Sequence, residues 1–168
     1  LACLPPGQLG RGALEPLDDG RTRVTHTYDW TELTDDKRFM LLQFVTPASS
    51  IGVVDVKANR YIGEIETSGC INAMPAGNRT FFALCGDGSA LRIALDDDGR
   101  EASRKRYPKL FDPDADPLHE SGIRSGNTWY FVSHRGQIHP VDVAGADFKF
   151  LPTWSIARKD GDMTWIPG

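Results

Sequence analysis

The feature that most constrains the fold of this chain is a pair of apolar runs that occurs three times. The copies of the first run lie at 38–44, 79–85 and 128–132, and those of the second lie at 51–56, 91–96 and 137–143. Successive copies are about 40 to 48 residues apart, a spacing typical of four-stranded propeller blades. The repeat therefore predicts a scaffold of equivalent antiparallel sheets.

Turn residues between these runs favour an all-β fold. Gly, Asn or Asp recurs roughly every 8–12 residues between β-branched and aromatic runs, for example at 76–78, 96–99 and 144–146. Helical periodicity is hard to find, and its best stretch, 157–162, is too short and polar to stand alone. In the first complete unit we expect strands near 26–33, 38–45, 50–56 and 60–66.

The runs and turns predict a partial β-propeller of about three to three and a half four-stranded antiparallel blades. We interpret 1–24 as the end of a preceding blade and a connector, and 25–68 as a blade. A second blade covers 69–116 with an Asp/Pro loop, a third covers 117–153, and 154–168 would start another. Such a set leaves open sheet edges, so we expect a longer parent that closes with further blades.

Composition narrows the possible functions. The 168 residues carry a net charge of −4 and are 40% hydrophobic, as expected of one soluble globular domain. Mild acidity argues against nucleic acid, and the short basic run at 104–106 is better explained as a solvated strand edge. No apolar stretch approaches the roughly twenty residues that cross a bilayer.

Two of the three cysteines suit a disulfide. Cys70 and Cys85 lie equally far along the chain from Gly77-Asn78, so in a hairpin folded there they face each other across adjacent strands. A disulfide would imply an oxidising compartment such as a bacterial periplasm, and the alternative is two buried thiols that happen to align. Cys3 is left over, with a partner elsewhere or none.

Motifs for catalysis or metal binding are weak. His134 and His139 lie an odd number of residues apart with a turn between them, and His119-Glu120 lacks the second histidine of a zinc-protease helix. His26 and His119 could still line a channel. The acidic run 112–116 hints at calcium, but Pro and Ile occupy the places of the required Gly and Glu, so a solvated loop is the better interpretation. We therefore expect no catalytic, cofactor-binding or metal-binding residue in this chain.

Several strings together are similar to a known family. They are TPASSIGVVDV (46–56), IGEI (62–65), GC (69–70), LCGDG (84–88), LFDPD (110–114), TWYFVS (128–133), VDV (141–143) and KFLP (149–152). Over about residues 22–168 the chain resembles the heavy (large) chain of bacterial amine dehydrogenases, more closely the aromatic-amine than the methylamine type.

The resemblance implies a seven-bladed periplasmic propeller in an α2β2 complex with a small light chain. The light chain would carry tryptophan tryptophylquinone and oxidise primary amines to aldehyde and ammonia, passing electrons to a blue copper protein of the azurin or amicyanin type. This chain would hold no cofactor and would support the substrate channel. The family's hairpin disulfide corresponds to Cys70 and Cys85. The family's channel aromatic belongs to a region not present here, so no channel residue is carried over.

Two other classes of function remain open. One is a periplasmic or surface propeller that binds a protein or ligand without enzymatic activity. The other is a propeller enzyme with its own central site, such as a lactonase or a pyrroloquinoline-quinone dehydrogenase. The last is the weakest, because no converging carboxylates or metal ligands recur at equivalent positions of the repeat.

Overall fold

The regular structure of the described part of this protein is all β. The computed structural model describes residues 10–16, 22–28, 31–45, 48–119 and 121–156, and every regular element among them is a strand. Within those ranges no helix is long and apolar enough to cross a membrane. The all-β expectation is confirmed.

Three antiparallel sheets follow one another along the chain, after a separate two-stranded sheet of β1 (Gly10–Pro16) and β2 (Thr22–Tyr28). The first sheet contains β3 (Thr31–Leu33), β4 (Phe39–Phe44), β5 (Ser50–Asp55) and β6 (Arg60–Glu66). The second contains β7 (Cys70–Pro75), β8 (Thr80–Cys85), β9 (Ala90–Leu95) and β10 (Glu101–Tyr107). The third contains β11 (Ile123–Ser125), β12 (Thr128–Val132), β13 (Gln137–Asp142), β14 (Lys149–Phe150) and β15 (Trp154–Ser155).

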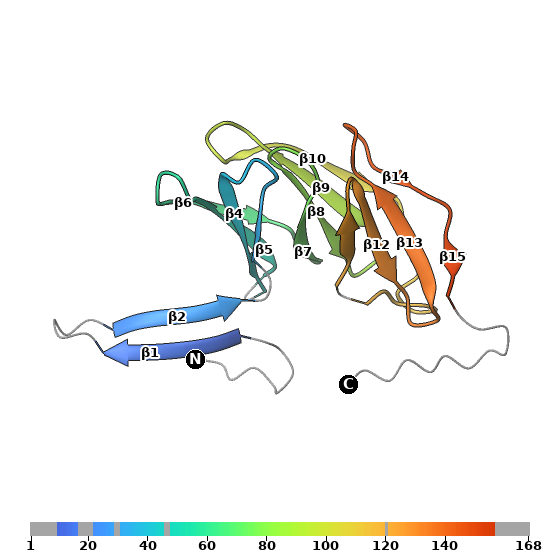
Figure 1. The fold of residues 1–168 in the computed structure, drawn as a ribbon, viewed down its shortest axis with the longest axis horizontal. Coiled ribbons are helices and arrows are strands. Elements are labelled where there is room, and N and C mark those ends of the chain that lie inside the picture. The colour runs from blue at the N-terminus through green and yellow to red at the C-terminus, as the bar shows by residue number, and fades with distance from the viewer. Residues whose placement is uncertain (1–9, 17–21, 29–30, 46–47, 120, 157–168) are drawn as a thin grey trace.

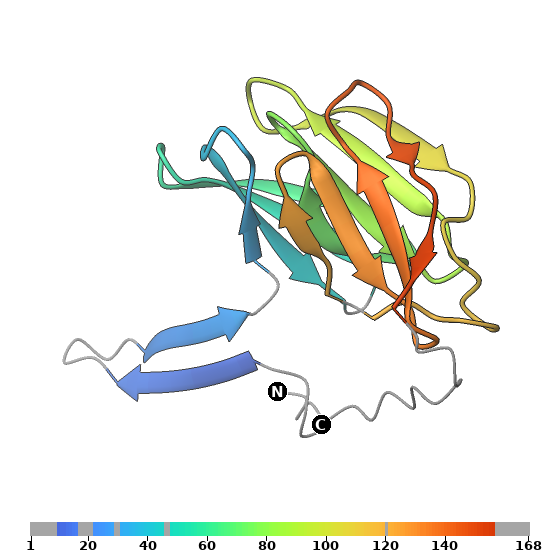
Figure 2. The same ribbon diagram turned by 45° about the vertical axis from the view of Figure 1, so that its right-hand side comes forward.

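The sheets stand side by side in chain order, with the second between the other two (Figure 1). In each, the strands pair in sequence order, except that β15 pairs with β13, so each sheet is an up-and-down meander. The turned view shows the third sheet in front of the second (Figure 2). This is a partial β-propeller, as the repeat predicted.

A carboxylate at the same position of each copy explains part of the repeat. Asp55 and Asp142 end the third strands of their sheets, and Asp96 directly follows the third strand of the second sheet. In each case Oδ1 accepts a hydrogen bond from the backbone N–H two residues later, at 3.0, 2.9 and 2.9 Å. Because an Asp side chain in this position stabilises a tight turn, the repeated Asp starts the turn that follows the third strand.

Strand β8 lies at the centre of the molecule, and all six of its residues are buried. Successive side chains of a strand point to opposite faces. Phe81 and Ala83 accordingly pack in the core between the first and second sheets, whereas Phe82 and Leu84 pack in the core between the second and third. The apolar run at 79–85 therefore belongs to a sheet that is covered on both faces.

The second core is rich in aromatic rings. Phe82 meets Trp129, Phe131 and Phe148 edge to face, with centroids 6.1, 6.1 and 5.1 Å apart. Trp129 also donates its indole N–H to the carbonyl oxygen of Pro75 at 2.9 Å. The third sheet is thus attached to the second by packing and by a buried hydrogen bond.

The expected strand over 26–33 is divided between two sheets. β2 pairs with β1, and the first sheet begins with β3 at Thr31. The first sheet therefore starts later than the boundary at residue 25 that the sequence suggested.

The outer strand of the third sheet is interrupted. β14 pairs with β13 through Phe150 and Val141, and β15 pairs with β13 through Trp154 and Ile138. The register changes by one residue between them, across Pro152, which has no N–H to donate to a ladder. β14 and β15 are thus two parts of one bulged outer strand. Trp154 and Ser155, expected to start another blade, lie in this strand, and residues 157–168 lie outside the described ranges.

Candidate functional site

The first strands of the three sheets share one side of the molecule and border a groove. β3 contacts β7, and Arg124 of β11 reaches the loop that follows β3. An open hollow of 720 Å³ lies here, lined by Glu32, Leu33, Asp35, Lys37, Met40, Val56, Pro75, Arg124 and Trp129. This inner groove takes residues from all three sheets, which makes it the leading candidate for a functional surface.

Asp35, one of the residues that line the inner groove, connects the three sheets. Its carboxylate accepts two hydrogen bonds from Arg124 Nη1 and Nη2 at 2.6 and 2.9 Å, and one from the backbone N–H of Gly77 at 2.9 Å. Asp35 belongs to the first sheet, Gly77 to the second and Arg124 to the third. The hydrogen bonds from Arg124 hold the pKa of Asp35 below its ordinary value. The Asp35–Arg124 ion pair therefore joins the first sheet to the third, and we call it the clamp.

Glu32 lines the same groove, but unlike Asp35 it is not held by hydrogen bonds. In the described residues its carboxylate has no hydrogen-bond partner, and its interaction with Arg124 is Coulombic. Although Glu32 is exposed, the protein surface around its carboxylate removes part of its hydration and raises its pKa, and the positive charge of Arg124 acts in the opposite direction. Glu32 is thus an ionisable acceptor with unused hydrogen-bonding capacity.

A second set of charges joins the first two sheets at the same end. Arg79 pairs with Asp36 at 2.8 Å and also with Asp97, while Arg38 pairs with Asp55 at 3.0 Å. All of these groups except Asp97 line a shallow hollow, which Lys57 also borders. Their ion pairs explain how the turns are fixed.

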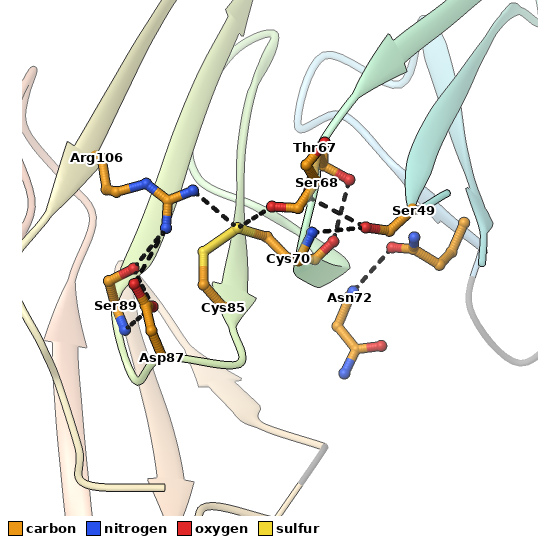
Figure 3. The surroundings of a disulfide bond; sticks show 11 residues. Ser49, Thr67, Ser68, Cys70, Asn72, Cys85, Asp87, Ser89 and Arg106 are labelled. Atoms are coloured by element: carbon orange, nitrogen blue, oxygen red, sulfur yellow. Dashed lines mark hydrogen bonds and ion pairs between the residues drawn. A yellow bond between two sulfur atoms is a disulfide. The ribbon is translucent and has the colours of Figure 1, made fainter. Parts of the chain in front are cut away.

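The disulfide forms as predicted. Cys70 and Cys85 are direct partners across β7 and β8, and their sulfur atoms are 2.07 Å apart. Figure 3 shows Arg106 beside them, with Nη2 donating to Cys70 Sγ at 3.6 Å and Nη1 donating to Ser89 Oγ at 2.8 Å. Both cysteines are buried. The bridge therefore joins the start of β7 to the end of β8, at the end of the hairpin away from its loop and inside the protein.

The path between the two cysteines differs from the simple turn that the sequence suggested. Ala76 N–H bonds to Thr80 O, so the loop has three residues, 77–79, rather than two. A bulge between Ile71 and Met74, with Asn72 at a φ of 65°, shifts the register by one residue. The bulge compensates for the longer loop, and the cysteines still face each other.

The bulge is held against the first sheet. The backbone N–H of Asn72 donates to Gln43 Oε1 at 2.9 Å, and Gln43 Nε2 donates to Ser50 O at 3.2 Å. On the other side of the disulfide, Gly69 N–H donates to Ser49 Oγ and Thr67 Oγ1 donates to Cys70 O, both at 3.0 Å (Figure 3). The disulfide therefore stabilises the seam between the first two sheets as well as its own hairpin.

The histidines of the sequence do not converge. His134 and His119 are exposed, and His139 is half-buried with Nδ1 at 3.2 Å from Leu110 O. His26 lies on β2, and its side chain, like Cys3 and Glu120, falls outside the described residues. In the described part of the chain, no three His, Cys, Asp or Glu side chains are placed to hold a metal ion.

The acidic loop and the basic run have structural partners. Asp112 Oδ1 accepts the backbone N–H groups of Asp114 and Ala115, which is the hydrogen bonding of a turn. Arg104 pairs with Glu101 at 2.5 Å, and Lys105 pairs with Asp147 at 2.5 Å, on the exposed strand β10. Both segments thus have the solvated, structural character that the sequence indicated.

Sequence reasoning missed the residues of the inner groove. Asp35 lies between the expected strands 26–33 and 38–45 and was not singled out, and neither were Glu32 and Arg124. Asp35 and Arg124 are 89 positions apart, and no local pattern connects them. Their proximity could have been found only by placing the loop that follows β3 next to β11, and this needs the relative positions of the first and third sheets.

The stacked meanders and the groove along their first strands define a β-propeller scaffold. The family model of the methylamine dehydrogenase heavy chain matches residues 12–168. The chain is 30% identical over 149 residues to the methylamine dehydrogenase heavy chain of Methylorubrum extorquens, covering 84% of this chain and 35% of that protein. It is 26% identical over 158 residues to the heavy chain of Paracoccus versutus, covering 90% of this chain and 36% of that protein. This chain belongs to the methylamine dehydrogenase heavy chain family.

A solved structure supports the fold alone. A functionally unknown protein from Desulfotomaculum acetoxidans DSM 771 is similar with a TM-score of 0.58 and 13% identity, over 88% of this chain and 52% of that one. The chain spans about a third of the length of the curated heavy chains that it matches.

Proposed function

We propose that this chain is part of the propeller (heavy) subunit of a periplasmic, tryptophan tryptophylquinone-dependent amine dehydrogenase. In this proposal a small light chain carries the quinone, and two copies of each subunit form an α2β2 complex. The complex converts a primary amine and water to an aldehyde and ammonia. The two electrons released pass through the quinone to a blue copper protein of the azurin or amicyanin type.

The observation that carries this proposal is the family match over residues 12–168, which extends across all three sheets. The heavy-chain relatives are named as subunits of a dehydrogenase that acts on an amine. The buried disulfide is in keeping with an oxidising compartment. Together these features favour a subunit that positions its partner.

The tryptophans of the described residues do not suit a quinone made in this chain. Tryptophan tryptophylquinone requires two tryptophans that can be cross-linked to each other. Trp129 pairs with Val141 and Trp154 pairs with Ile138, which places the two indoles on opposite faces of the third sheet. Trp129 is buried and its N–H is already bonded to Pro75 O. This arrangement supports a cofactor held by the partner.

Co-expression tests the proposal. The full-length heavy chain is tagged and expressed with a small, Cys-rich light chain from a neighbouring reading frame, and the purified material is assayed for amine-dependent reduction of a dye. We expect a coloured complex that contains both chains and oxidises a primary amine. A light chain with one cofactor tryptophan replaced by Phe is the control, which should assemble but remain colourless and inactive. A solitary, colourless heavy chain would overturn the proposal and favour a binding propeller without enzymatic activity.

A further inference from the structure

The shallow hollow between the first two sheets has more positive than negative groups in its wall. It is open, measures 570 Å³, and takes side chains from the loop after β3, the turn after β5 and the β7–β8 loop. Its lining residues include three cations and two carboxylates, which leaves one positive charge in excess; they are Arg38, Lys57 and Arg79, and Asp36 and Asp55. A hollow with such an excess attracts anions.

The two carboxylates of the hollow are well supplied with donors. Asp55 accepts Nε and Nη2 of Arg38 on Oδ2, at 3.1 and 3.0 Å, and two backbone N–H groups of its own turn on Oδ1. Asp36 accepts the hydroxyl of Thr34 on Oδ1 at 2.6 Å and Nε of Arg79 on Oδ2 at 2.8 Å. Because these oxygens have their hydrogen bonds, they do not take up the other donors around the hollow.

Three donor groups around the hollow are left over. In the described residues, Nη1 of Arg38 has no hydrogen-bond partner. Arg79 donates Nε to Asp36 and Nη1 to Asp97, and its Nη2 has no partner in the described part of the chain. Lys57 is exposed, and its ammonium group makes no hydrogen bond or ion pair with any described residue. The three groups come from different loops and border one hollow.

Both guanidinium groups are held in place before any ligand arrives. Cζ of Arg38 lies 4.8 Å from the centre of the Phe39 ring, over its face. Arg79 has a φ of 53° at the end of the 77–79 loop, a position that Gly usually occupies because it adopts this conformation without strain. An arginine therefore stands at a strained position from which its side chain reaches the first sheet. Donors fixed in this way lose little freedom on binding.

We propose that the shallow hollow binds a small oxyanion of the phosphate or carboxylate type. The oxygens accept charge-assisted hydrogen bonds from Nη1 of Arg38, Nη2 of Arg79 and Nζ of Lys57, and guanidinium groups suit the oxygen spacing of both kinds of anion. Asp97, whose side chain is 93% exposed beside Arg79, competes with the ligand for that arginine. Binding in the hollow needs neither the quinone nor an amine.

Isothermal titration calorimetry on the full-length heavy chain, used as it purifies with or without a light chain, tests the proposal. The probes are sodium phosphate and sodium malonate at one ionic strength fixed with sodium chloride, because salt screens exposed charges. We expect phosphate to bind and Lys57→Gln to weaken its binding by about threefold or more. Asp97→Asn should strengthen the binding by about threefold, because it removes a competing negative charge and frees Nη1 of Arg79.

Two further variants make the result specific to the hollow. Lys57→Arg keeps the positive charge and should keep the affinity within about twofold. Lys149→Gln removes an exposed positive charge from β14, outside the hollow, and should leave the affinity unchanged. The Lys57 side chain makes no hydrogen bond in the described structure, so its replacement should leave the fold intact, and circular dichroism checks each variant.

The outcomes decide the proposal and its ligand. Tighter binding of phosphate than of malonate supports a phosphate site, and the reverse supports a carboxylate site. No heat of binding beyond that of chloride, equal affinity in wild type and Lys57→Gln, or weaker binding in Asp97→Asn would each overturn the proposal. An assembled complex that fails to oxidise amines would overturn the proposed function and leave these measurements standing.

Discussion

Replacing Asp35 by Ala should weaken the contact among all three sheets. The substitution removes two hydrogen bonds from Arg124 and one from Gly77 N–H. The side chains of Arg124 and Asp35 are 24% and 27% exposed, so solvent screens the pair only in part. Discounting charged hydrogen bonds for this exposure gives a loss of about 2 kcal/mol in the free energy of unfolding, or about 4–8 °C in Tm.

A double-mutant cycle isolates the ion pair from the other effects of the substitution. Urea unfolding at pH 7 is measured for wild type, Asp35→Ala, Arg124→Ala and the double variant. We expect a coupling energy of about 1 kcal/mol between the two positions. Asp97→Ala is the matched control, because the Asp97 side chain is 93% exposed beside Arg79, and its loss should not change the urea midpoint measurably. A coupling energy indistinguishable from zero would refute the clamp.

The same pair has a defined pH dependence. The Arg124 hydrogen bonds lower the pKa of Asp35 in the folded state, so the stabilisation is complete above the unfolded-state pKa of about 4. It is lost as the pH falls through the lower folded-state pKa. The stability difference between wild type and Asp35→Asn should therefore be constant near neutral pH and shrink in acid. A difference that grew on acidification would contradict the assignment.

Three further comparisons of variants test other parts of the fold by urea unfolding. Replacing both Cys70 and Cys85 by Ser should lower the free energy of unfolding by about 3 kcal/mol, since the bridge spans 15 positions, and a variant as stable as the oxidised wild type would argue against a closed bridge. Trp129→Phe leaves Pro75 O without its donor and should lower the free energy of unfolding by about 1–2 kcal/mol, while Trp154→Phe on the exposed strand β15 should change nothing measurable. Gly88→Ala should destabilise more than Gly126→Ala; both glycines have positive φ, but a Cβ at 88 would lie 2.2 Å from Phe111 O, whereas 126 has open space. Equal losses at the two glycines would show that the Phe111 contact is unimportant.

Local sequence patterns were sufficient for the sheets and for the disulfide. The apolar runs mark strands because each strand must bury one face, or both faces in the case of β8. The cysteine pairing was predictable because hairpin register depends on residues close together in the chain. The bulge at Asn72 was not, since it is held by Gln43 of the neighbouring sheet.

The inner groove could not be derived in the same way. It depends on how separate sheets are placed, and its clamp joins positions 89 residues apart. The broken outer strand of the third sheet was also not predicted, because a blade boundary was expected after residue 153 although the strand resumes at Trp154. Contacts between sheets are set by packing that periodicity within one segment does not encode.

The central claim of the proposed function is that the reacting quinone belongs to a partner subunit and not to this chain. The most direct test treats the co-purified complex with phenylhydrazine, which forms a stable adduct with a quinone carbonyl, and then separates the chains for mass spectrometry. The account predicts an adduct on the small partner and an unmodified heavy chain. An adduct on the heavy chain within residues 1–168 would contradict it.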